Sequence, residues 1–200
     1  MKKNSFLSLF IGILLFLPSC TRLSYDIVPH KTATYHSLAL KVNVKNQDSG
    51  QRDNFKILLK YDDSMDKMFF LSPLNQVYGL LLLESEHALL IATKKKKYWK
   101  GTFNDLVQEI CGLDFDYREF KRLVVDGVLP EDKIKEQGLN ISFEEGLPGE
   151  APQRLKIEKG ALSIKLKISD RKTGKGIISF SRGLKGMKEA GIRELLEEEG

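Results

Sequence analysis

The chain has 200 residues, of which 42% are hydrophobic and 30% are charged. These shares fit one folded domain with appendages, and they exclude an intrinsically disordered chain and a polytopic membrane protein. Two cysteines are too few for a disulfide-stapled secreted module, and three scattered histidines argue against a zinc site.

The first nineteen residues have the pattern of a secretory signal. Lys2 and Lys3 form a basic start, and residues 6–17 are apolar apart from one serine and one glycine. This run is too short to cross a hydrocarbon core about 30 Å thick, which needs roughly 20 residues, but it suits the apolar region of a signal peptide. Its loss leaves 30 basic residues against 27 acidic ones, a net charge of +3 that gives no reason to expect nucleic acid as a partner.

The segment after the apolar run resembles the lipobox of bacterial lipoproteins. Leu17-Pro18-Ser19-Cys20 places a leucine three residues before a cysteine and a small residue directly before it. The resemblance implies that residues 1–19 are a lipoprotein signal peptide and that Cys20 carries covalent lipid, with no other cofactor. Several acyl chains anchor a protein essentially permanently. Thr21 stands where an aspartate would resemble an inner-membrane retention signal, which favours the periplasmic face of the outer membrane. An uncleaved anchor or a plain signal peptide is the alternative.

Residues 20–34 are polar and aperiodic, which predicts a flexible tether. From residue 35 apolar and polar residues alternate with a period of two, which is typical of antiparallel strands with one buried face. Residues 172–175 are expected to form a turn. The predicted strands are 38–44, 55–61, 68–71, 77–83, 88–93, 98–100, 139–143, 155–158, 162–169 and 176–181.

The period changes to that of a helix after Thr102, which is a good capping residue, and Gly112 is expected to end this helix. A second helix is predicted from Asp116 to about Val125, and residues 186–200 are expected to form a C-terminal helix or tail. Strands, then helices, then strands again predict an α+β fold, in which short helices cover a curved antiparallel sheet. Two helices of about ten residues cover only part of its apolar face, so we expect an apolar cavity beside them.

No motif of catalysis is present in the sequence. It contains no Gly-x-Ser-x-Gly, no His-Glu-x-x-His, no glycine-rich phosphate loop and no Cys-x-x-Cys. Glu84, Glu86 and His87 could form an acid–base cluster, but a solvated hairpin tip is the better interpretation. Cys111 is interpreted as a small core residue and not as a nucleophile. We therefore expect neither enzymatic activity nor a bound metal.

Several short segments together resemble the LolB family of outer-membrane lipoproteins, which has the LolA/LolB fold. The resemblance covers about residues 35–170 of an expected domain at 35–185. It rests on the lipobox, Pro73-Leu74, Tyr98-Trp99, Cys111-Gly112-Leu113, the Asp-Gly-Val-Leu-Pro of 126–130 and the strands of 155–169. It implies a monomeric half-open β-barrel with two or three helices as a lid. Such a protein receives lipoprotein acyl chains from a LolA-type periplasmic carrier and helps to insert them into the outer membrane.

Leu74, by its position in this resemblance, is expected to contact membrane lipids. It lies at a loop tip that is poorly suited to a core, although single exposed leucines are common. The acyl chains are expected on the apolar strand faces, where simple core packing is the alternative for each residue. These candidates are Leu40, Val42, Ile57, Leu59, Phe70, Leu81, Leu83 and Leu90. The alternative function is that of a structural envelope lipoprotein with a filled core that docks a protein partner.

Overall fold

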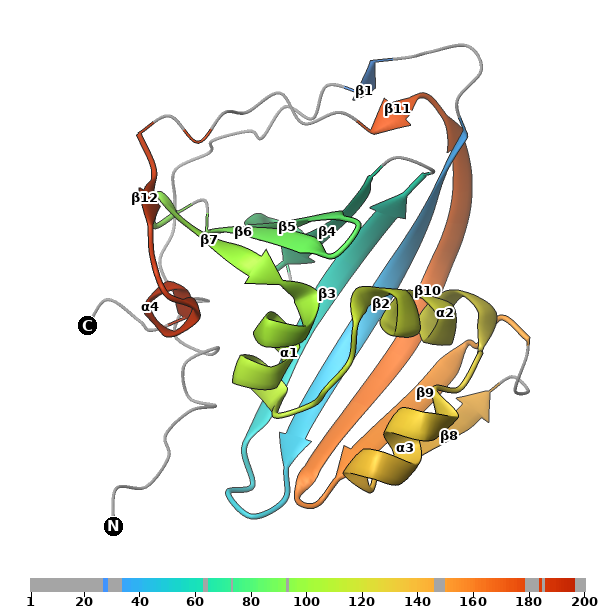
Figure 1. The fold of residues 1–200 in the computed structure, drawn as a ribbon. Coiled ribbons are helices and arrows are strands. Elements are labelled where there is room, and N and C mark those ends of the chain that lie inside the picture. The colour runs from blue at the N-terminus through green and yellow to red at the C-terminus, as the bar shows by residue number, and fades with distance from the viewer. Residues whose placement is uncertain are drawn as a thin grey trace.

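The computed structural model describes residues 27–28, 34–62, 65–72, 74–92, 94–145, 150–178, 184 and 186–196 (Figure 1). The main sheet has ten strands in the order β12-β7-β6-β5-β4-β3-β2-β10-β9-β8. Their bounds are β2 Thr34–Asn46, β3 Arg52–Tyr61, β4 Asp66–Leu71, β5 Val77–Glu84, β6 His87–Ala92, β7 Lys97–Thr102, β8 Asn140–Glu145, β9 Arg154–Lys159, β10 Leu162–Lys175 and β12 Lys188–Glu189. The β12–β7 pair is parallel, and the other pairs in this sheet are antiparallel.

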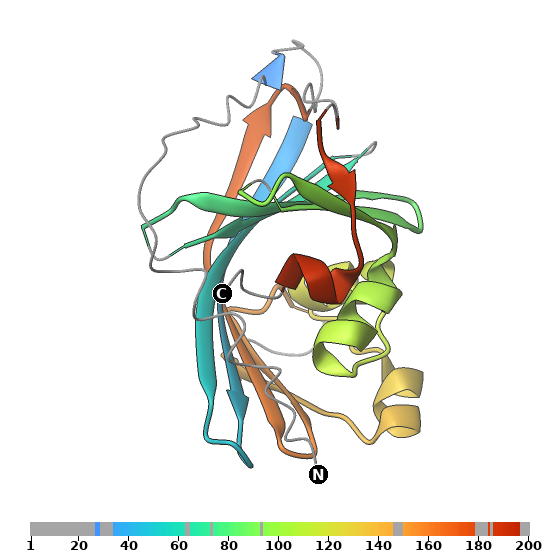
Figure 2. The ribbon, with the colours of Figure 1, turned by 90° about the vertical axis from the view of Figure 1, so that its left-hand side faces the viewer.

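The sheet is strongly curved but does not close. Figure 2 shows the long strands β2, β3 and β10 running upright while β4 to β7 fold over them, so that the sheet partly encloses the helices. Its edges are β12 and β8, which do not pair with each other. The predicted α+β class, with a curved antiparallel sheet under short helices, is confirmed.

The helices lie over the concave face of the sheet (Figures 1 and 2). They are α1 Phe103–Cys111, α2 Tyr117–Asp126, α3 Glu131–Gln137 and α4 Ile192–Leu196. Thr102 and Asp105 form a capping box at α1, and Asp116 and Glu119 form another at α2. These contacts satisfy backbone donors that the first helical turn leaves unpaired, which confirms the predicted starts.

Gly127 ends α2 for two physical reasons. Its φ is +69°, in the left-handed region that disfavours side chains, and a Cβ atom there would lie 2.2 Å from the carbonyl oxygen of Glu150. The glycine therefore permits the helix to stop and the segment before β9 to pass close beside it. The sequence interpretation missed α3, because none of its residues is buried and it carries no apolar face.

The predicted turn at residues 172–175 is wrong. These residues continue β10 and pair with β2, from Lys172 opposite Ser37 to Lys175 opposite Thr34. Turn-forming residues are tolerated here because the thirteen-residue β2 supplies ladder partners along its whole length. The chain then forms β11 (Ile177–Ile178), which pairs with β1 (Ile27–Val28) in a separate two-stranded sheet.

Both faces of β4, β5 and β6 are apolar. Alternate residues point to opposite sides of a strand, so Leu81 and Leu83 join the main core while Leu80 and Leu82 face outward. The outward group is nevertheless buried, in a second cluster with Phe69 and Ile91, and Leu184 and Met187 pack against this cluster. Leu184 and Met187 therefore cover part of the back of the sheet, and β12, which follows Met187, pairs with β7.

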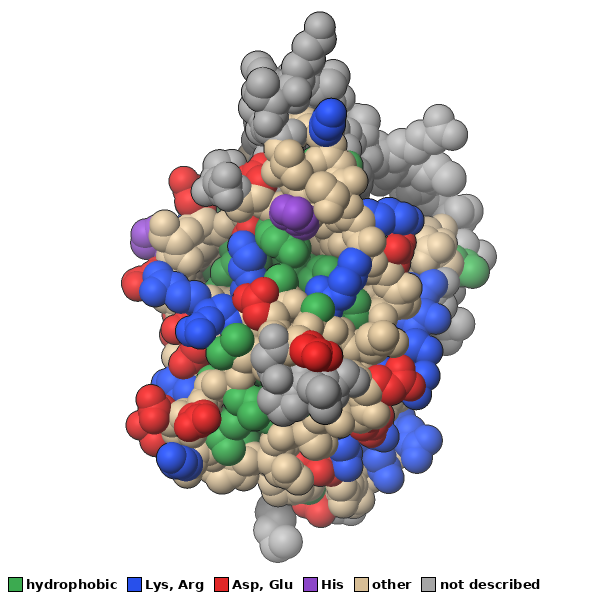
Figure 3. All heavy atoms as spheres, turned by 90° about the vertical axis from the view of Figure 1, so that its right-hand side faces the viewer, with side chains coloured by type: hydrophobic (Ala, Val, Ile, Leu, Met, Phe, Trp, Pro, Cys, Tyr) green, Lys and Arg blue, Asp and Glu red, His purple; other side chains and the backbone are tan. Residues whose placement is uncertain are grey.

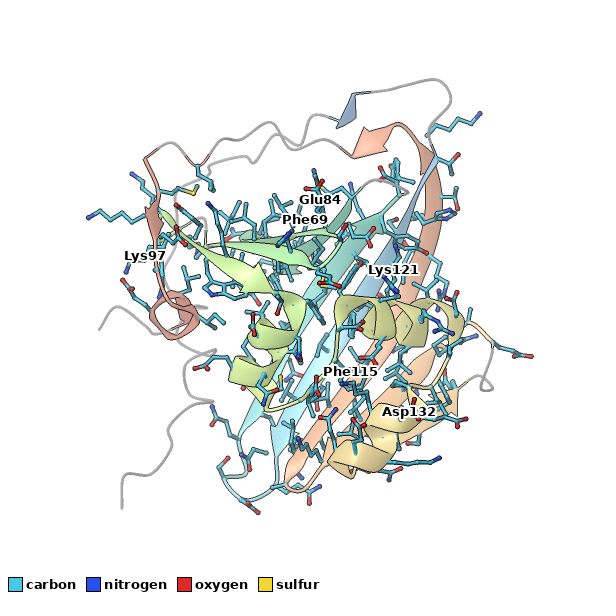
Figure 4. The ribbon with its side chains drawn as sticks, in the orientation of Figure 1. Phe69, Glu84, Lys97, Phe115, Lys121 and Asp132 are labelled. Carbon is cyan, nitrogen blue, oxygen red and sulfur yellow. The ribbon has the colours of Figure 1, made fainter. Side chains whose placement is uncertain are left out.

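The C-terminal helix α4 belongs to the main core. Leu195 is 3% exposed and contributes to the same cluster as the concave face of the sheet. Lys97 in β7 forms an ion pair of 3.0 Å with Glu194, and Figure 4 shows Lys97 beside this helix. This end of the chain therefore covers the concave face next to β7.

Candidate functional site

The concave face of the sheet brings the predicted apolar residues together. Leu40 pairs with Ile57, Ile57 with Phe70, and Leu81 with Leu90 across neighbouring strands. Phe70 is half-buried, whereas the other seven are between 0% and 8% exposed. These seven are Leu40, Val42, Ile57, Leu59, Leu81, Leu83 and Leu90. Side chains directly opposite each other on one face of a sheet pack together, so the strands present one continuous apolar surface.

The helices cover this surface with a small aromatic and aliphatic layer. Phe103 of α1 contacts the rings of Tyr117 and Phe120 of α2 at centroid distances of 5.4 and 5.5 Å. Phe115, between the two helices, and Leu123 are at most 3% exposed, and Figure 4 shows Phe115 between the helices and the sheet. This layer is apolar toward the sheet. A hydrocarbon chain placed there would meet the same apolar environment as a core side chain.

A bulge in β10 turns an arginine toward the helices. The pairing with β2 shifts between Ile168 and Asp170, so that Arg171 lies opposite Leu38, a residue of the concave face. Without the shift, strict alternation would place Asp170 inside and Arg171 outside. The bulge therefore decides which charge the concave side receives.

Arg171 binds the C-terminal end of α2. Its Nη2 donates to the carbonyl oxygens of Val124, at 3.2 Å, and Pro152, at 2.8 Å, and its Nη1 donates to that of Val125 at 3.4 Å. The last carbonyls of a helix lack partners and carry partial negative charge, so a cation is favourable there. Arg171 is exposed as a whole residue, and only the part of its guanidinium at the helix end is buried, which lowers its pKa.

Two further cations fasten the helices to the sheet. Lys159 of β9 donates to the carbonyl oxygen of Gly112, at the end of α1, at 2.7 Å. Lys121 of α2 forms an ion pair of 2.8 Å with Asp66 of β4, and its ammonium lies 4.6 Å from the ring centre of Tyr61. The sequence interpretation missed all three cations, because their partners are far away in the chain. We call α1, α2 and the residues between them the lid.

An opening lies where the first turns of α1 and α2 meet the ends of the strands. It has a volume of about 570 Å³, and both polar side chains and core residues line it. Leu83 and Phe103 join it to the main core, and Asp62, Glu86, Arg118 and Lys121 are among its charged residues. Leu83, one of the predicted cavity residues, therefore lines this opening.

Three buried oxygens at this opening have no hydrogen-bond partner in the described part of the chain. They are Asp66 Oδ1, Asn104 Oδ1 and Tyr117 Oη, of which the Tyr117 hydroxyl lies near the Asp66 carboxylate without the geometry of a regular hydrogen bond. Burial first, and then the charge of the nearby Asp66 carboxylate, raises the pKa of Tyr117, so its phenol stays protonated. The opening therefore combines buried polar atoms with core residues such as Leu83 and Phe103.

Leu74 is 75% exposed, in the turn between β4 and β5. Asn75 after it has a φ of +61°, a backbone conformation that asparagine adopts more readily than most residues. The Asn75 side chain accepts a hydrogen bond of 2.9 Å from Lys56 Nζ. The structure thus presents Leu74 to solvent on a turn tied to β3.

Other predicted features do not gather at this site. Cys20 and its signal lie outside the described residues. Burial raises the pKa of the Cys111 thiol to about 12, which leaves it un-ionised at neutral pH. Among the described residues, no group of three or more His, Cys, Asp or Glu side chains could hold a metal ion. Within the same ranges, no helix has the length and apolar character that a membrane crossing requires.

Comparison with known proteins finds similar solved structures. The chain is similar to a LolA superfamily protein from Nitrosomonas europaea, with 10% identity, a TM-score of 0.43 and coverage of 74% of this chain and 89% of that one. It is also similar to an uncharacterized conserved protein from Thermus thermophilus, with 11% identity, a TM-score of 0.43 and coverage of 80% and 91%. No family model and no curated protein matches the sequence.

Proposed function

We propose that this protein binds acyl chains between its lid and the apolar face of its open sheet. As a lipid-anchored protein of the cell envelope, it would use this site to accept lipoproteins and help place them in the outer membrane, without enzymatic chemistry. The observation that carries the proposal is the unclosed ten-stranded sheet, whose continuous apolar face is covered by short helices that three cations hold to the sheet.

Separating such a lid from the sheet breaks a few polar contacts at its rim and exposes apolar surface on both sides. An acyl chain entering the gap would cover that surface again and gain about 0.8 kcal/mol for each CH₂ group that it buries. Lid closure and acyl binding then compete for the same apolar surface, so the free energy of acyl binding can offset that of lid opening. Transfer of an acyl chain between two proteins of this kind therefore needs no ATP. The direction of transfer would follow from the difference between their affinities.

A structural envelope lipoprotein is the second candidate. It is favoured by the burial of the concave face, where Leu59 and Leu123 are 0% exposed. A protein partner on the outer surface would then be the ligand, and the interior would be a closed core of native packing density.

Trp99 provides the test that separates the two candidates. It is the single tryptophan of the chain, lies opposite Leu90 on the concave side and packs against the main core. A chain that starts at Thr21, and so lacks its own acyl groups, is titrated with a fatty acid that carries a dansyl group. Saturable energy transfer from Trp99, reversed by unlabelled lipopeptide, is expected for acyl binding. No transfer at high micromolar concentration would favour the structural candidate.

Two matched substitutions locate the bound chain. Leu83 and Leu82 are neighbours in β5, but Leu83 lines the opening whereas Leu82 belongs to the cluster on the back of the sheet. Enlarging a buried residue costs roughly 1–3 kcal/mol of stability in either place. Leu83→Phe should weaken fatty-acid binding and Leu82→Phe should not. Equal effects of the two would mean that the ligand does not enter through this opening.

A further inference from the structure

Four cations form one row across the back of the sheet. Lys56 of β3 lies opposite Lys41 of β2, Lys41 lies opposite Lys167 of β10, and Lys167 lies opposite Arg154 of β9. Neighbouring strands are about 4.8 Å apart, so the row spans roughly 14 Å of sheet. We call these four residues the basic row. Figure 3 shows Lys and Arg side chains gathered along its right-hand margin, which is the back of the sheet as Figure 1 draws it.

Like charges directly opposite each other destabilise a sheet, so the row needs a physical explanation. The chain neutralises the cations near β8, where Glu145 pairs with Arg154 at 2.9 Å and Glu144 pairs with Lys165 at 2.7 Å. It does not neutralise the middle of the row. Lys41 and Lys167 are exposed, and neither makes an ion pair or hydrogen bond with another described residue. The uncompensated charge therefore lies in the middle of the basic row, on β2 and β10.

The central cations surround a hollow of about 410 Å³. Its walls consist of cations, two asparagines, Phe55 and one carboxylate, that of Glu144, which pairs with Lys165; the cations and asparagines are Lys41, Lys56, Arg154, Lys165, Lys167, Asn43 and Asn54. Val42 and Leu166 also line it, but their side chains belong to the core on the other face, so they contribute backbone to its floor. Lys165 is neutralised by Glu144, but the ammonium groups of Lys41 and Lys167 make no ion pair with a described residue, and as charged donors they suit the oxygens of a phosphate group.

A hydrogen bond links the wall of the hollow to the turn that carries the exposed Leu74. The Lys56 ammonium, at one end of the basic row, donates to Asn75, the residue after Leu74. Figure 2 shows the β4–β5 hairpin projecting behind β2 and β3, on the side of the sheet that carries the row. An apolar side chain beside a cationic surface matches the boundary of a bilayer, where lipid phosphates lie just outside the hydrocarbon.

We propose that the basic row is a docking site for the anionic phosphates of lipid headgroups and that it holds the domain with its back, and Leu74, against the membrane. The site does not depend on acyl binding beneath the lid. Attraction to an anionic surface corresponds to about a fivefold gain in affinity for each lysine or arginine near it, and salt weakens it because ions screen exposed charges.

Lysine acetylation of the full chain tests this proposal, because it detects contact separately from anchoring. The protein is reconstituted in phosphatidylcholine vesicles with or without phosphatidylglycerol and treated briefly with an acetylating reagent, and each lysine is quantified by mass spectrometry. In the anionic vesicles, modification of Lys41 and Lys167 should fall about fivefold and recover in high salt. Lys135, exposed on α3 over the concave face, is the internal control and should not change.

Paired variants and a soluble anion distinguish lipid headgroups from other anionic ligands. Lys41→Gln with Lys167→Gln should abolish the protection of Lys56 by phosphatidylglycerol, while Lys135→Gln with Lys172→Gln should preserve it. Equal modification of Lys41 and Lys167 in both kinds of vesicle would overturn the proposal. A surface that binds an acidic protein instead of lipid would give this result. Protection by inorganic phosphate in detergent, without protection by anionic vesicles, would overturn the assignment to headgroups. Energy transfer from Trp99 to the fatty acid tests the interior separately, so failure of one proposal leaves the other standing.

Discussion

Replacing Arg171 with alanine should loosen the lid while leaving the sheet intact. The guanidinium is the group that the β10 bulge turns inward, and it binds the carbonyl oxygens of Val124, Val125 and Pro152. Arg171→Ala removes all three contacts and leaves those oxygens to find water. The strand itself keeps its backbone hydrogen bonds to β2.

The size of the effect follows from the geometry of these bonds. Opening the lid breaks only the two bonds from Arg171 to α2, because Pro152 lies outside the lid. A hydrogen bond of good length from a charged group contributes about 1.5–3 kcal/mol net, and these two, at 3.2 and 3.4 Å, are longer and weaker, so together they contribute about as much as one such bond. We therefore expect the free energy of lid opening to fall by about 2 kcal/mol, which raises the open fraction roughly thirtyfold.

Amide hydrogen exchange measures this opening directly. The last turn of α2 should exchange roughly thirtyfold faster in Arg171→Ala, whereas the central amides of β2 and β3 should change much less, because a local opening leaves them protected. The rate of association with the dansyl fatty acid should rise with the open fraction. Lys172→Ala is the matched control, since Lys172 is the next residue, is 73% exposed and pairs with Asp170.

Two results would refute this reasoning. Equal acceleration of exchange in α2 and in the sheet would mean that the lid does not open separately from the domain. Faster exchange in α2 without faster fatty-acid association would mean that the lid does not control access to the interior.

Three further predictions concern other parts of the chain. In cells, Leu74→Glu should impair the delivery of lipoproteins to the outer membrane. The Tm of the variant protein should be unchanged, because Leu74 is 75% exposed and surface substitutions usually change stability by less than about 0.5 kcal/mol. Normal delivery would contradict the proposed contact of Leu74 with the membrane. Lys67 is 1% exposed, and burial lowers its pKa from 10.5 to about 8. Between pH 8 and pH 10.5 the unfolded chain therefore binds more protons than the folded protein, and the folded protein gains stability as the pH rises. Lys67→Met should therefore be more stable than the native protein by about 3 kcal/mol at pH 7 in denaturant titrations, and this advantage should disappear toward pH 10.5; a constant difference would show that charge burial is not its cause. Cys111, whose pKa is about 12 against an ordinary 9.0, should react with iodoacetamide at pH 8 about a thousandfold more slowly in the native chain starting at Thr21 than in urea; similar rates would indicate that the end of α1 opens freely.

Local patterns in the sequence predicted most of the secondary structure. Thr102 and Asp116 cap their helices because each side chain reaches a backbone N–H three residues away, and the alternating residues of β2 and β3 need only their own period to show which face is apolar. The eight apolar candidates lie together on the concave face because each occupies one of the alternate positions of its strand that point to that face. The short helix α3 and residues 170–175 of β10 were missed because their local composition resembles that of loops, and for the β10 segment the pairing with β2 decides the conformation.

The amino-acid sequence alone determined the α+β class, the apolar faces and the ends of the main helices, because these depend on residues a few positions apart. Tertiary structure decided which charges meet. Arg171 faces the lid only because the pairing of β10 with β2 shifts by one residue, and Lys41, Lys56, Arg154 and Lys167 form a row only through the register of four strands from distant parts of the chain. Strand register depends on the balance of packing over the whole sheet, so the period of a single segment does not contain it.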